Sequence, residues 1–144
     1  MRRLMVRNVC ALLLVFVLVG GVGYAGGADL SGVWKVETQN GPVYSDGRAT
    51  FESAGEGRYT GVVESTVYLR DGAVVRQYSL LAAVKGDEVR IELILLGDSR
   101  DAGAKTQIKA KIKDGGQKLD GMGYGFGVFY TSYTRTRMGA VTVK

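Results

Sequence analysis

The sequence predicts an all-β protein, an eight-stranded antiparallel up-and-down barrel preceded by a signal peptide. Three observations lead to this fold class. The first 28 residues have the composition of an export leader. The rest of the chain alternates between apolar and polar residues in short segments, which is the period of strands rather than of helices. Glycine-containing turn sequences separate these segments.

The leader has three parts. Arg2, Arg3 and Arg7 give it a positive start, residues 9–19 form an uncharged apolar stretch, and residues 20–28 are small and rich in glycine. A secretory signal has an apolar stretch of about 7–15 residues. A membrane-spanning helix needs about 20. We therefore expect this segment to be cleaved, and the mature chain to have no integral membrane span.

Residues 1–28 are thus assigned to a signal peptide and residues 29–144 to a single β-barrel domain, within the usual size of one domain. The expected location of the mature protein is the periplasm or the extracellular space. The expected mature chain has neither cysteine nor histidine, because the single cysteine, Cys10, lies in the leader and the sequence contains no histidine. A Cys/His metal site, a cysteine nucleophile and a Ser–His–Asp triad are therefore excluded. We expect no enzymatic activity, no catalytic residue, no metal and no cofactor.

The net charge of +5 gives little support to a nucleic-acid partner. Three of the 19 basic residues lie in the leader, which leaves 16 basic and 14 acidic residues in the mature chain. The lysines of residues 104–113 form one stripe, but they alternate with apolar residues instead of exposed aromatic rings that could stack on bases. We interpret the stripe as a solvated face, with contact to an anionic partner as the alternative, and expect no nucleic acid.

Eight segments of the mature chain have the pattern of strands. The first opens with Gly32-Val33-Trp34. Within residues 58–69, Tyr59, Val63 and Val67 alternate with polar residues, and residues 87–96 and 104–113 alternate still more regularly. The full set is 31–37, 48–54, 58–69, 73–84, 87–96, 104–113, 117–122 and 126–137.

Short connections favour antiparallel pairing of consecutive strands, and eight such strands can close into a barrel without exposed edges. A two-sheet sandwich of the same strands is the alternative. In the barrel, residues 38–47, 97–103 and 121–127 would form long loops at one end, while the other end has only tight turns. This asymmetry predicts a closed end and an open mouth. Loops on a rigid scaffold often bind ligands, so Tyr44, Tyr124 and Phe126 are the candidate ligand-binding residues.

The two ends of the mature chain resemble the calycin superfamily, which contains the lipocalins. Gly32-Val33-Trp34 is similar to the Gly-x-Trp of the first lipocalin strand, and Arg135 and Arg137 lie where the last strand ends. The resemblance implies that one of these arginines packs over Trp34 at the closed end of the barrel. The chain departs from the family pattern by being short and by lacking both a disulfide and a helix after the last strand.

These observations leave two hypotheses for function. The first is an exported binding protein that carries or senses a small apolar or amphipathic ligand inside the barrel. The second is an envelope interaction or inhibitor protein that acts through its surface loops and has a packed interior. The two differ in whether the interior is open or filled. The identity of the ligand and the oligomeric state are not determined by the sequence.

Overall fold

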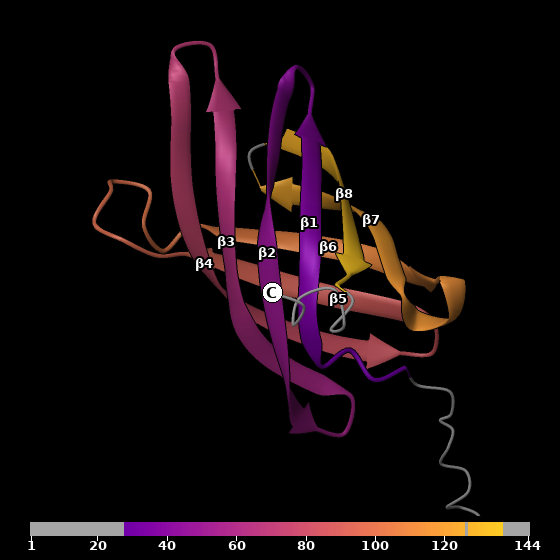
Figure 1. Cartoon of the computed structure of the whole chain (residues 1–144). Coiled ribbons are helices and arrows are strands. Elements are labelled where there is room, and N and C mark those ends of the chain that lie inside the picture. Colours follow the sequence, from indigo (N-terminus) through magenta and orange to yellow (C-terminus); the bar gives the residue numbers. More distant parts are fainter. Residues whose placement is uncertain (1–27, 126, 137–144) are drawn as a thin grey trace, which may run out of the picture.

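The computed structural model describes residues 28–125 and 127–136, which form a closed barrel of eight antiparallel strands (Figure 1). Each strand pairs with the next in the chain, and the last pairs with the first. A 3-10 turn, η2 (Asp114–Gly116), joins the sixth and seventh strands. The bounds are β1 (Gly32–Asn40), β2 (Val43–Gly55), β3 (Arg58–Leu69), β4 (Gly72–Lys85), β5 (Glu88–Leu95), β6 (Lys105–Lys113), β7 (Lys118–Gly125) and β8 (Gly127–Arg135).

The predicted eight-stranded antiparallel barrel is confirmed, and the alternative of two separate sheets is wrong. The predicted signal peptide, except for Ala28, lies outside the described residues.

Alternation along the strands separates the side chains inside the barrel from those outside it, as the β5–β6 pair illustrates. Ile91 lies opposite Ile108 in the pairing register, and both are buried in the core. Arg90 and Lys109, one residue away, are also opposite each other and face the solvent. Successive side chains of a strand point to opposite faces of the sheet, so one face of each strand fills the barrel.

Aromatic side chains close one end of the barrel. Trp34, Tyr59 and Tyr133 surround Phe51, with ring centroids 5.8–6.1 Å from the Phe51 centroid. Leu30, just before β1, is completely buried in the same core. Its backbone N–H donates a hydrogen bond to the Tyr59 hydroxyl at 3.1 Å, and its carbonyl accepts one from the Trp34 indole N–H at 2.9 Å. The segment before β1 is therefore part of the closure.

Arg135, the last residue of β8, fixes this segment from the other side. Its guanidinium carbon lies 4.4 Å from the centroid of the Trp34 ring. The same guanidinium donates hydrogen bonds to three backbone carbonyls, those of Asp29 at 2.7 Å, Ser31 at 2.8 Å and Gly116 at 3.1 Å. One side chain thus joins the two ends of the barrel domain and the turn η2. A cation over an aromatic face contributes about 0.5–2 kcal/mol.

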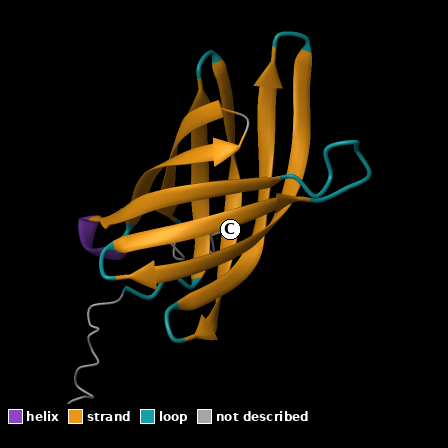
Figure 2. Ribbon diagram, turned by 180° about the vertical axis from the view of Figure 1, so that it is seen from behind, coloured by secondary structure: helices purple, strands orange, loops and turns teal. Residues whose placement is uncertain are grey.

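The opposite end differs from the predicted set of long loops. Strands β1 and β2 extend to a tight turn at residues 41–42, and β7 and β8 stay paired as far as Gly125 and Gly127, so the long loops expected at 38–47 and 121–127 are wrong. Polar residues such as Thr38 and Ser45 favour a loop in the sequence, yet both line the interior. The long connection predicted between β5 and β6 is present and projects from the barrel (Figure 2).

Candidate functional site

The half of the barrel away from Trp34 encloses a cavity of about 360 Å³. Its walls are inward-facing side chains of β1 to β6 and β8. Leu69 and Asp101, which are exposed, belong to its rim, so the cavity opens at the end that carries the β3–β4 and β5–β6 connections. The volume is within the range of about 300–1,000 Å³ that is typical of small-molecule sites. Most of the wall is apolar, as given by Val36, Val63, Val67, Leu93, Leu95, Ile108 and Phe129.

Hydroxyl groups interrupt this apolar wall on several strands. Thr38 and Thr131, from β1 and β8, share a hydrogen bond of 3.1 Å between their side-chain oxygens. Ser65 of β3 and Thr106 of β6 also line the cavity, and Ser65 is buried. Apolar walls with a few placed polar groups are typical of ligand sites, because the polar groups orient a molecule that the apolar surface retains.

Tyr133 marks the deep end of the cavity, beside the aromatic cluster. Its side chain is completely buried, and within the described part of the chain its hydroxyl has no hydrogen-bond partner. Burial raises the pKa of Tyr133, and the neighbouring Tyr78, which lines the same cavity, raises it further. A buried hydroxyl without a partner costs about 1–3 kcal/mol. A polar atom of a molecule in the cavity would therefore gain from pairing with this group.

Arg76 brings a positive charge to the cavity from β4. It is half-buried, and none of the described carboxylates lies within ion-pair distance of its guanidinium. Asp101, in the β5–β6 loop, is the other charged residue of the wall and is exposed. Among the described strands, Arg76 is thus the only charged residue that lines the cavity.

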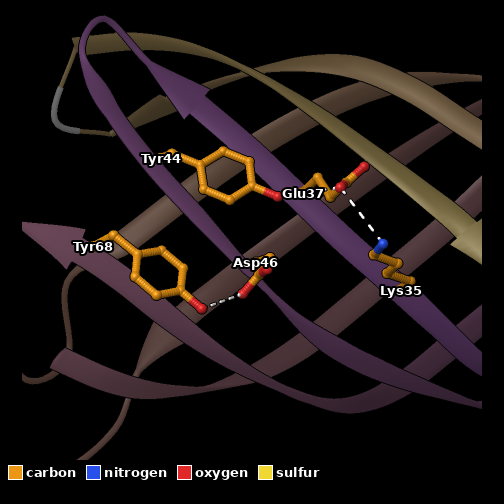
Figure 3. A network of polar contacts seen from close by, with 5 residues as sticks. All are labelled: Lys35, Glu37, Tyr44, Asp46 and Tyr68. Atoms are coloured by element: carbon orange, nitrogen blue, oxygen red, sulfur yellow. Dashed lines mark hydrogen bonds and ion pairs between the residues drawn. The ribbon is translucent and has the colours of Figure 1, made fainter. Parts of the chain in front are cut away.

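Two of the predicted ligand-binding residues lie outside this cavity. Tyr44 and Tyr124 are on the outer faces of β2 and β7 and do not line the interior cavity. Tyr44 donates a hydrogen bond to Glu37 at 3.1 Å and stacks beside Tyr68, with ring centroids 6.0 Å apart (Figure 3). Phe126 is outside the described residues. The interior site is therefore assembled without the tyrosines expected at the mouth.

Three of the residues assigned a structural role, Gly32, Trp34 and Arg135, lie together at the closed end. Trp34 is completely buried, and of the two candidate arginines Arg135 makes the contact with its ring, while Arg137 lies outside the described residues. Gly32 has a φ of 124° and lies against Arg135, 3.5 Å from the position that a Cβ atom would occupy. A side chain is disfavoured at this φ, which is the physical reason for glycine before the tryptophan.

Sequence reasoning missed Arg76 and Tyr78 as lining residues, although a signal is present. Leu80 and Ala82 are buried inward-facing residues of β4. Because side chains on one face recur every second residue, counting back from Leu80 places Tyr78 and then Arg76 on the interior face. Charged residues are rarely buried without a partner. The sequence alone therefore favours an outward position for Arg76, although the alternation places it inside.

The outer surface carries a larger hollow of about 680 Å³ over β3 to β7, where Tyr124 lies. Charged side chains such as Arg58, Arg90 and Lys109 line it. Two of these, Arg90 and Lys109, share Glu88 as ion-pair partner at 3.9 and 3.6 Å. The remaining lysines of β6 also form ion pairs on the outside of the barrel. A surface hollow with paired charges is a weaker candidate for an apolar ligand than the interior cavity.

No group of three or more histidine, cysteine, aspartate or glutamate side chains has the arrangement of a metal site within residues 28–125 and 127–136. No helix in those ranges is long and apolar enough to cross a membrane.

No protein-family model and no curated protein matches the chain. Solved structures of similar shape include a redesigned β-barrel, mFAP1, bound to DFHBI, with a TM-score of 0.61 and 20% identity over 74% of this chain and 94% of that one. A fluorescence-activating β-barrel designed de novo has a TM-score of 0.60 and 13% identity over 74% and 93% of the two chains.

Fatty-acid-binding protein 1 of Echinococcus granulosus is more distant, with a TM-score of 0.41 and 15% identity over 74% of this chain and 97% of that one. At these identities the likeness concerns the fold alone. The two designed barrels support a closed β-barrel as the fold, and the strand pairing of this chain makes it an eight-stranded antiparallel one.

Proposed function

We propose that this chain is an exported binding protein whose barrel interior carries or senses a small apolar or amphipathic molecule. The observation that carries the proposal is the cavity of about 360 Å³ above a packed floor. A barrel that needed only a stable scaffold would gain by filling this space, because each unfilled volume loses contacts and hydrophobic stabilisation. The redesigned barrel mFAP1, which is similar in fold, was solved with the small molecule DFHBI bound.

The second hypothesis, an envelope interaction or inhibitor protein with a packed interior, is less well supported. Its distinguishing feature is a filled barrel, and only the half around Phe51 and Trp34 is filled. The mouth also offers less loop surface than that hypothesis expects, since only the β5–β6 connection is long among the described residues. The open half of the interior therefore favours the binding function over the surface-interaction function.

A thermal-shift screen of the mature protein with fatty acids, isoprenoids and aromatic amphiphiles tests this function. A ligand at 100 times its dissociation constant adds about 2.7 kcal/mol to the free energy of unfolding. Val67→Trp should abolish the shift, because Val67 lines the cavity and a larger side chain would occupy it. Thr66→Trp is the matched control, since Thr66 points to the opposite face. Loss of binding in both variants, or in neither, would argue against an interior site.

Export is a separate part of the proposal. Mass spectrometry of the protein recovered from its native source should give an N-terminus between Gly26 and Asp29. Cleavage there would keep Leu30, which is completely buried in the closed end. An intact Met1, or recovery from the cytoplasm, would refute export without affecting the assignment of the interior site.

A further inference from the structure

We propose that the natural ligand is an anionic single-chain amphiphile whose acidic head group pairs with Arg76 at the mouth of the barrel. This inference rests on the proposed binding function and gives its ligand a chemical class. The shared chemistry is a carboxylate or a phosphate monoester on an apolar tail. Three observations on the described residues support it: the position of Arg76, its lack of an ion-pair partner, and the apolar surface next to it.

The position of Arg76 follows from the register of β4. Arg76 lies opposite Ser65 of β3, and Tyr78, two residues further along the inner face, lies opposite Val63. Arg76 is thus nearer to the β3–β4 turn, which is at the open end of the cavity, than Tyr78 is. A head group at Arg76 would remain near solvent while its tail extended toward the closed end.

The charge of Arg76 is uncompensated among the described residues. The basic side chains that do contact carboxylates lie on the outer surface, with nitrogen–oxygen distances of 3.6–3.9 Å. The guanidinium of Arg76 instead lines an apolar cavity while half-buried. Partial burial of a charge without a partner is unfavourable. A planar guanidinium binds carboxylate and phosphate through paired hydrogen bonds, so an acidic ligand supplies the missing partner.

The apolar surface next to Arg76 suits a hydrocarbon tail. Leu95 and Leu93 of β5, Val63 of β3 and Ile108 of β6 line the cavity toward the closed end. No carboxylate of the described strands is part of the wall, and the single acidic lining residue, Asp101, is in an exposed loop at the rim. An anion therefore meets one cation on the wall and one screened carboxylate at the edge.

Three probes with the same tail and different heads test the inference: decanoate, 1-decanol and decyltrimethylammonium. Each is titrated into the mature protein carrying the neutral dye N-phenyl-1-naphthylamine, and displacement gives the affinity. Decanoate should bind about tenfold more tightly than 1-decanol, as expected for a charge-assisted hydrogen bond, and the cation should bind most weakly. Decyl phosphate in the same assay distinguishes a phosphate head group from a carboxylate.

Variants assign the preference to Arg76. Arg76→Gln should remove the tenfold advantage of decanoate while leaving 1-decanol unchanged, and Arg76→Lys should keep most of it. Asp101→Asn, which also changes the charge of the rim by one, should strengthen decanoate binding. Arg90→Gln, which removes an exposed arginine from the outer face of β5, should leave the ratio of decanoate to decanol affinity as it is. The melting temperature of each variant without ligand checks that it has folded.

Two results would overturn the inference in distinguishable ways. If 1-decanol or the cation bound the wild-type protein as well as decanoate, or if Arg76→Gln left the preference intact, the barrel would still be a binding protein but its ligand would not be selected by Arg76. If neither the dye nor any probe bound, the proposed function itself would fail, and the inference with it.

Discussion

Trp34 is the residue on which the closed end most depends. Its ring contacts Phe51 on one side and the guanidinium of Arg135 on the other, and its indole N–H holds the carbonyl of Leu30. Trp34→Ala should lower the free energy of unfolding by about 3–5 kcal/mol, because it removes a large buried aromatic side chain and leaves a cavity. Urea denaturation of both proteins measures the difference, and a loss below about 1 kcal/mol would contradict the role assigned to Trp34.

Tyr133 makes the stability of the barrel sensitive to alkaline pH. Burial raises the pKa of its hydroxyl, so the folded protein keeps this proton where the unfolded chain has lost it. The stability linked to this proton is fully present below the ordinary tyrosine pKa of about 10. Above that pH the free energy of unfolding falls by about 1.4 kcal/mol per pH unit.

In Tyr133→Phe, stability should therefore fall less steeply above pH 10 than in the wild type. Denaturation curves measured at several alkaline pH values show this slope. Tyr130→Phe, on the same strand but exposed, is the control and should follow the wild type. A slope that Tyr133→Phe left unchanged would mean that the hydroxyl is not protected from ionisation.

At the scale of the elements, the sequence predicts the parts of the strands near the closed end better than the parts near the mouth. Residues 104–113 place alanine, isoleucine and one threonine on one face and lysine and one glutamine on the other, so the inner and outer faces differ clearly in polarity. At the mouth the inner faces carry Thr38, Ser45 and Arg76, and polarity no longer distinguishes inside from outside. The polar residues that make the cavity amphipathic also remove the apolar–polar alternation from which these strand segments would be predicted.

Close contacts between strands explain several glycines that a local pattern marks only as turn signals. A Cβ atom on Gly61 of β3 would collide with the backbone carbonyl of Thr50 in β2, and one on Gly47 would collide with the backbone of Glu64. Strands in a closed barrel coil strongly, and glycine lets neighbouring backbones approach. These positions depend on partners far along the chain, which a local pattern does not contain.

Gly61→Ala tests this account of the barrel wall. Because the added methyl group meets backbone atoms rather than a flexible side chain, the strands must shift, and overpacking of this kind costs about 1–3 kcal/mol. Thr60→Ala, at the neighbouring exposed position, should change stability much less. Equal stability of Gly61→Ala and wild type in urea denaturation would show that β2 and β3 do not approach as closely as described.

At the scale of the whole molecule, the barrel combines a closed half and an open half. Aromatic packing around Phe51 and the bonds of Arg135 stabilise the first, which leaves the second free to hold a cavity. The asymmetry of the connections predicts these two halves, although two of the three long loops on which that argument relies are absent. The sequence does not predict the residues of the site, because a loop position for Tyr44 and Tyr124 says nothing of the strand face on which each lies.

The direct test of the central claim, that the interior of the barrel holds an apolar ligand, is nuclear magnetic resonance of the methyl-labelled protein bound to decanoate. Nuclear Overhauser contacts should join the ligand chain to the inward-facing methyl groups of Val67 and Leu93. The outward-facing and exposed Val62 and Val75 are internal controls and should give none. Contacts to Val62 or Val75 without any to Val67 and Leu93 would place the ligand on the outer surface and contradict the claim.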